Sequence, residues 1–108
     1  MSKMGTRADR IERGMTLLDA KAPGWIDKID LDRLDQGSGR TCVVGQVYRS
    51  LGRRYGAYWD GLEALGLVAT VVDDEVAAHG FETRDERESY DALTRAWRAA
   101  IKRRRDPS

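Results

Sequence analysis

Side chains suited to catalysis or metal binding are scarce in this chain, whose 108 residues include one cysteine, Cys42, and one histidine, His79. A cysteine nucleophile needs a base beside it, and a structural zinc site needs four thiolate or imidazole ligands. One residue of each type cannot complete such a zinc site. We therefore expect Cys42 to be a buried thiol in the first turn of a helix. We expect no catalytic residue, metal or cofactor, and a Cys42-dependent activity is the alternative.

The stretch "DQGSGRTCVVGQVY" around Cys42 has the glycines of a phosphate-binding loop without their spacing. A P-loop ends in Gly-Lys-Ser/Thr and has another glycine five residues before the last one. Arg40 occupies the lysine position and Leu34 the position of the earlier glycine. A dinucleotide-binding fingerprint also fails, because Cys42 replaces its third glycine. The pattern therefore predicts a turn between two helices.

Thr41 is the predicted N-cap of the helix that follows this turn, because its hydroxyl can accept a hydrogen bond from a free backbone N–H. If the turn acts directly, we expect Ser38 and Arg40 to be the residues that face a partner. A second polar stretch, "DKIDLDRLD", lacks the glycine and the closing glutamate of a calcium-binding loop. We interpret its aspartates as a solvated acidic face.

Two basic segments suggest nucleic-acid binding as the alternative function. The segment 53–59, "RRYGAYW", interleaves arginines with aromatic residues, and bases dominate the end of the last predicted helix. Arginine binds phosphate and aromatic rings stack on bases, but bases also suit a helix C-terminus and the aromatic residues 58 and 59 also suit the core of a small domain. The alternative site consists of Arg53, Arg54, Arg98, Lys102, Arg103, Arg104 and Arg105.

Composition restricts the class of protein. The 19 Lys and Arg residues nearly balance the 18 Asp and Glu residues, which argues against an acidic DNA mimic and against a uniformly basic protein. A lone cysteine suits a reducing compartment, and the sequence has no signal peptide and no apolar run long enough to span a bilayer. We expect a cytoplasmic protein with no membrane contact. It should form one domain over residues 1–108, with frayed ends at 1–5 and 103–108.

Apolar spacing predicts an all-α domain: a compact bundle of about five short helices with a long C-terminal helix. The first helix should begin near Thr6 and end before Pro23, followed by a short helix near 24–29 and a turn through Leu34. A further helix should run from Thr41 through Leu51, although its β-branched residues leave a strand as a competitor.

The second half should continue with helices at 58–65 and 73–79, each ending at a glycine, Gly66 or Gly80. The best strand candidate, 67–72, is interpreted as an extended connector or part of a helix. The last helix should start at a capping box of Thr83 and Glu86. The predicted core consists of Ile11, Leu18, Trp25, Ile29, Val43, Val44, Val47, Leu51, Leu62, Leu65, Phe81, Tyr90, Leu93, Trp97 and Ile101.

Five segments occur in order: "PGWIDKIDLDRLD", "CVVGQVY", "GLEALGL", "HGFE" and "SYDALTRAWRAAI". In this order they resemble a group of small proteins of actinobacteria and, above all, of their bacteriophages, over roughly residues 10 to 101. The chain departs from the group in "RSLGRR" and "VATVV". The resemblance implies no catalytic or binding residue. It implies a small regulatory module that binds a host or phage protein without catalysis, and it leaves the oligomeric state open.

Overall fold

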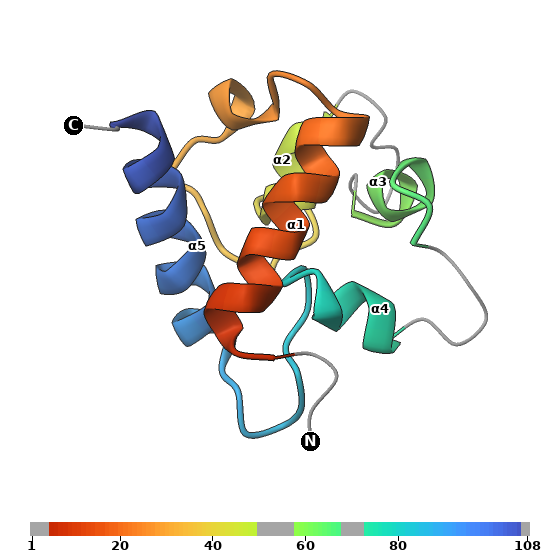
Figure 1. The fold of residues 1–108 in the computed structure, drawn as a ribbon, viewed down its shortest axis with the longest axis vertical. Coiled ribbons are helices and arrows are strands. Elements are labelled where there is room, and N and C mark those ends of the chain that lie inside the picture. Colours follow the sequence, from red (N-terminus) through yellow and green to blue (C-terminus); the bar gives the residue numbers. More distant parts are fainter. Residues whose placement is uncertain (1–4, 50–57, 68–72, 107–108) are drawn as a thin grey trace.

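The computed structural model describes residues 5–49, 58–67 and 73–106, and in these ranges the chain is helical and has no strand (Figure 1). This confirms the predicted all-α class with a long C-terminal helix. The elements are α1 (Arg7–Lys21), the 3-10 helix η1 (Trp25–Lys28), α2 (Val43–Val47), α3 (Tyr58–Ala64), α4 (Asp73–Ala78) and α5 (Tyr90–Arg105).

Helix α1 begins at a reciprocal cap. The Thr6 hydroxyl accepts a hydrogen bond from the Asp9 amide at 3.0 Å, and the Asp9 carboxylate accepts one from the Thr6 amide at 3.0 Å. The helix ends at Lys21, ahead of Pro23, as the sequence predicts. Gly24, with φ of 82°, then turns the chain into η1.

The predicted start of the last helix is wrong. Helix α5 begins at Tyr90 with Ser89 as its N-cap, and the Ser89 hydroxyl accepts from the Ala92 amide at 3.0 Å. Thr83 and Glu86 lie in the irregular segment before it. The physical reason is Glu88, whose carboxylate accepts from the Arg84 amide at 2.6 Å and binds side chains of α1, which folds this segment into a loop. At the other end, α5 continues through Arg105, beyond the expected fraying at 103.

Helix α2 begins one residue later than predicted, because Cys42 and not Thr41 is its N-cap. The Cys42 Sγ atom accepts a hydrogen bond from the Gly45 amide at 3.2 Å. The Thr41 carbonyl accepts from the Asp35 amide and from Gln46 Nε2, which keeps Thr41 in the preceding turn. The helix is also shorter than predicted, since Tyr48 caps its end.

Helices α3 and α4 end as predicted at glycines with left-handed φ, 77° at Gly66 and 74° at Gly80. After each glycine, the next amide turns back to the helix: Leu67 N–H binds the Leu62 carbonyl, and Phe81 N–H binds the Val76 carbonyl. This closing pattern satisfies carbonyls that have no helical partner. It directs Leu67 and Phe81 into the core. The rest of the strand candidate, 68–72, lies outside the described residues.

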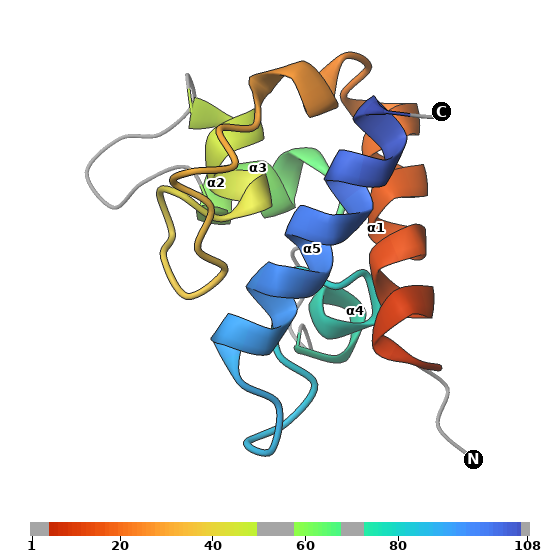
Figure 2. The ribbon, with the colours of Figure 1, turned by 90° about the vertical axis from the view of Figure 1, so that its left-hand side faces the viewer.

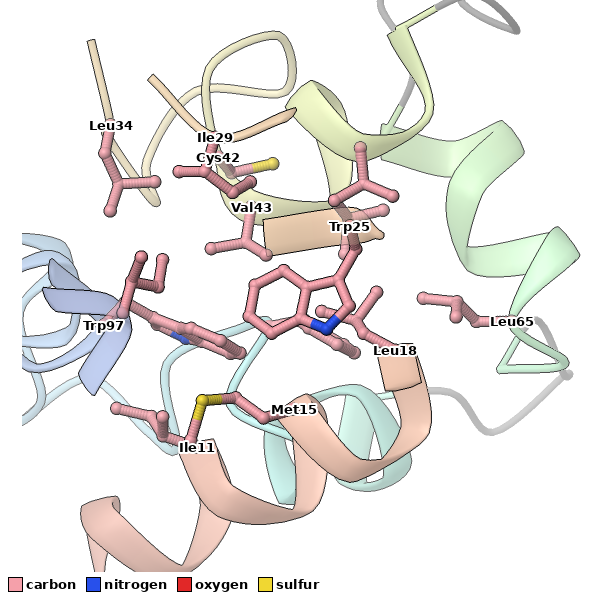
Figure 3. Packing of buried hydrophobic residues seen from close by; sticks show 14 of the residues in the cluster. Ile11, Met15, Leu18, Trp25, Ile29, Leu34, Cys42, Val43, Leu65 and Trp97 are labelled. Carbon is pink, nitrogen blue, oxygen red and sulfur yellow. The ribbon is translucent and has the colours of Figure 1, made fainter. Parts of the chain in front are cut away.

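Every described helix contributes to the core, including α3 through Leu62 and α4 through Val76 (Figures 2 and 3). Trp97 packs edge-on against Trp25, with ring centroids 6.3 Å apart, and stacks on Phe81 at 5.7 Å.

The predicted core residues within the described ranges are buried, with one exception. The prediction that Tyr90 lies in the core is wrong, since its side chain is 41% exposed. Helix α5 begins at this residue, and the side chain lies at the edge of the fold. Leu51 lies outside the described residues.

Helix α1 passes close to α4 and α5 at Gly14. A Cβ atom at this position would collide with the His79 carbonyl oxygen and would lie 3.1 Å from the Trp97 ring. The glycine costs helix stability, but it permits this close packing. Helix α3 lies on the opposite side of α1 from α5 (Figure 1).

Candidate functional site

Cys42 is buried in the first turn of α2, as predicted, and is 1% exposed. Burial raises the pKa of its thiol to about 11, although hydrogen bonds from the Gly45 amide and neighbouring amides act in the opposite direction. The thiol is therefore protonated at neutral pH, and its sulfur serves as a helix cap. Cys42 is positioned for packing and capping.

His79 lies at the end of α4, half-buried, with its ring stacked on Phe81 at 6.4 Å. Its Nδ1 atom lies 2.8 Å from the Glu75 carbonyl oxygen. Because a carbonyl can only accept, Nδ1 carries the hydrogen, and Nε2 has an acceptor lone pair in the neutral form of the ring. Within the described residues, no group of three or more His, Cys, Asp or Glu side chains could hold a metal ion.

The residues of the stretch Cys42–Gln46 serve the fold, through close backbone packing and hydrogen bonds. Gly45 lies against the backbone of the preceding turn, where a Cβ atom would be 2.5 Å from the Gly39 carbonyl oxygen. The Gln46 side chain accepts from the Asp30 amide at 2.6 Å and donates to the carbonyls of Asp30 and Thr41. These contacts tie the irregular segment before α2 to the helix itself.

The turn residues predicted to face a partner differ in availability. The Ser38 hydroxyl accepts from the Arg40 amide at 3.3 Å, and the Ser38 carbonyl accepts from the Cys42 amide at 3.0 Å. Ser38 is thus half-buried and occupied within the turn, whereas Arg40 is exposed. A partner-facing role for either residue stays a prediction.

Part of the predicted basic site is used to hold the fold. Arg98 donates to the carbonyls of Leu31 and Leu34 at 3.1–3.3 Å. Arg105 donates to the Ile29 carbonyl at 2.6 Å and also to that of Ile26.

Arg104 also takes part in the fold. It pairs with Asp19 at 2.7 Å and lies 5.9 Å from the Trp25 ring centroid. Lys102 and Arg103, in contrast, are exposed, and their side chains form no hydrogen bond or ion pair with the described residues. Arg53 and Arg54 lie outside the described residues.

Trp59 on α3 is 61% exposed, whereas Trp25 and Trp97 are 1% and 0% exposed. Its ring contacts the half-buried Tyr58 edge-on, with centroids 5.3 Å apart. The interpretation that assigned Trp59 to the core is wrong. Tyr58, Leu62 and Leu65 have the i, i+4, i+7 spacing of one buried face, and a residue next to Tyr58 projects about 100° away from it.

A shallow, open hollow of about 560 Å³ runs along α1 and was not predicted. Its described lining residues are Asp9, Glu12, Arg13, Thr16, Leu17 and Ala20 from α1, and His79 from the end of α4. The spacing of the α1 residues places them on one helix face, but only the fold brings His79 to its edge.

No described helix is long and apolar enough to cross a membrane. Comparison of the chain with protein-family models, with curated proteins and with solved structures gave no match. Its function is therefore inferred from its own surfaces.

Proposed function

We propose that this chain is a small protein-binding module that acts by presenting a surface, without chemistry of its own. The observation that carries the proposal is the exposure of Trp59. A chain of 108 residues has a small core, and two of its three tryptophans are used to fill it. Burying an exposed tryptophan against a partner contributes more binding energy than burying almost any other side chain.

The setting of Trp59 suits a binding anchor. Tyr58 supports one edge of the ring and is itself packed against the core, so part of the anchor is ordered before binding. A preordered aromatic side chain loses little conformational entropy on association. The resemblance to actinobacterial and phage proteins supports a host or phage protein as the partner.

Capture from an actinobacterial lysate treated with nuclease tests this function. We expect the wild-type chain to retain a protein that Trp59→Ala loses, because the substitution removes the anchor. Tyr90→Ala is the matched control, since Tyr90 is the other exposed large aromatic residue among those described. Identical captured proteins with wild type and Trp59→Ala would contradict the proposal.

Nucleic-acid binding is the second candidate, supported by the exposed Lys102 and Arg103. The arginines of its other predicted segment, Arg53 and Arg54, lie outside the described residues. The test is a salt titration of binding to random duplex DNA. Phosphate contacts by Lys102 and Arg103 predict that replacing both with Gln lowers the salt slope by about 2, and no binding at low salt would reject the candidate.

A further inference from the structure

The hollow along α1 differs from the Trp59 surface in its chemistry. Its lining residues extend from Asp9 to Ala20, which corresponds to about 16 Å along the helix axis. Leu17 and Ala20 supply apolar surface toward one end, and Asp9, Glu12 and His79 supply polar groups toward the other. We propose that this hollow binds a lysine or arginine side chain of a polypeptide partner, independently of Trp59.

Hydrogen bonding within the protein leaves mainly acceptors in the hollow. The Thr16 hydroxyl donates to the Glu12 carbonyl at 3.0 Å, so its remaining capacity is that of an acceptor. His79 uses its Nδ1 hydrogen on the Glu75 carbonyl, and Nε2 is an acceptor in the neutral form of the ring. The Glu12 carboxylate is exposed and forms no hydrogen bond or ion pair with the described residues. A ligand that complements these groups must bring donors.

The charges in the hollow favour a positive ligand. Among its described lining residues, Asp9 and Glu12 are the carboxylates and Arg13 is the cation. Arg13 donates to the Ala78 carbonyl at 2.6 Å. Hydrogen bonds from Thr6 lower the pKa of Asp9, and the charge of Arg13 adds to this effect, so Arg13 lies near Asp9. The Asp9 carboxylate accepts from the Thr6 amide, whereas the Glu12 carboxylate forms no hydrogen bond or ion pair with the described residues.

Lysine and arginine side chains meet both requirements. Each has a cationic head that only donates hydrogen bonds, and each has an apolar stem that can cover surface such as that of Leu17 and Ala20. An anionic ligand would meet the Glu12 carboxylate and the His79 lone pair without a partner. An uncharged apolar ligand would desolvate these groups without replacing their hydrogen bonds.

A peptide titration followed by NMR tests the site. The probes are acetyl-Ala-Leu-Arg-Leu-Ala-amide and the same peptide with citrulline, which keeps the shape of arginine and removes its charge. We expect the arginine peptide to shift the amides of Glu12 and Thr16 and the His79 ring in a saturable way. The citrulline peptide should bind about three- to fivefold more weakly, the upper end of the range for one exposed ion pair.

Matched variants locate the charge that matters. Glu12→Gln should weaken binding of the arginine peptide about three- to fivefold. Glu63→Gln on α3 removes another exposed carboxylate and should change nothing. The proposal is overturned if the two peptides bind alike, if Glu12→Gln behaves as Glu63→Gln, or if millimolar peptide leaves α1 unshifted. Trp59→Ala should leave this titration unchanged, so failure here is distinguishable from failure of the Trp59 surface.

Discussion

Two irregular connections in this fold are held by arginine side chains, and they differ in where those side chains lie. The connection between α4 and α5 (79–89) is held by Arg10 of α1. The Arg10 side chain is enclosed by the fold and is 1% exposed. It donates to the carbonyls of Ala77 and Glu82 at 2.7 Å each and pairs with the Glu88 carboxylate at 2.8 Å. Ala77 lies at the end of α4, where its carbonyl also accepts from the Gly80 amide, and Glu82 lies in the irregular segment that follows.

The connection between α1 and α2 (22–42) is held from the outside. Arg98 and Arg105 of α5 donate to carbonyls at 26–34, and Gln46 of α2 binds Asp30 and Thr41. Arg105 is exposed and Arg98 only partly buried. The comparison shows that the contribution of an arginine-to-carbonyl hydrogen bond to stability depends on where the bond lies. Losing such a bond inside the fold leaves buried polar groups without hydrogen-bond partners, whereas water can replace a lost bond at the surface.

The largest expected effect is that of Arg10→Met, about 3–5 kcal/mol of unfolding free energy. Methionine fills much of the space but leaves the Glu88 carboxylate, whose side chain is 7% exposed, without its buried partner. Urea denaturation measures the change. The double variant Arg10→Met/Glu88→Gln should recover part of the loss, because the buried carboxylate is then gone and only the exposed Arg7 loses its partner. A loss below about 1 kcal/mol would remove the distinction between the two connections.

The second-largest expected effect is that of acid, which should weaken the inner connection, the one between α4 and α5. Burial raises the pKa of Glu88, but hydrogen bonds from Arg10, Arg7 and the Arg84 amide outweigh it and lower this pKa from 4.5 to about 2. A carboxylate with a lowered pKa stabilises the fold fully above its unfolded value and loses that contribution as pH falls from about 4.5 toward 2. The contribution amounts to up to about 3 kcal/mol. Urea midpoints between these pH values should fall more steeply for wild type than for Glu88→Gln, and parallel curves would contradict this assignment.

The spacing of apolar residues along the sequence predicted the helices. Pairing between residues far apart in the sequence decided the features that this spacing did not predict. The stripes at Ile11 and Leu18, and at Leu93 and Trp97, follow from i, i+3 and i+4 contacts within one helix, and these residues are buried. The start of α5 could not be predicted locally, because Glu88 is fixed by Arg10, 78 residues away.

The candidate surfaces show the same limit. The basic residues at the end of α5 are visible in the sequence, but which of them bind backbone carbonyls depends on a segment more than 60 residues earlier. The hollow on α1 depends on His79 reaching that helix and on which donors are already used. The exposure of Trp59 could have been predicted from the sequence, because Tyr58 and Leu62 already occupy the buried face of α3.

Gln46→Ala should have an intermediate effect of about 1–2 kcal/mol. The substitution removes an acceptor for the Asp30 amide and donors for the carbonyls of Asp30 and Thr41, at a half-buried position without charge. Urea denaturation should place this variant between Arg10→Met and the substitutions at the end of α5. A cost equal to that of Arg10→Met would show that the outer connection depends on buried polar groups as strongly as the inner one.

The smallest effect is expected for Arg105→Ala, below about 1 kcal/mol. Water can hydrate the Ile26 and Ile29 carbonyls once the guanidinium is gone, because Arg105 is exposed and neither of its hydrogen bonds is fully buried. Arg103→Ala is the matched control, since Arg103 lies on the same helix end and its side chain forms no hydrogen bond or ion pair with the described residues; it should leave the urea midpoint unchanged. If Arg105→Ala instead matched Arg10→Met, burial would not be what separates the two connections. The end of α5 would then be a structural clamp throughout, with correspondingly less positive charge available to any partner.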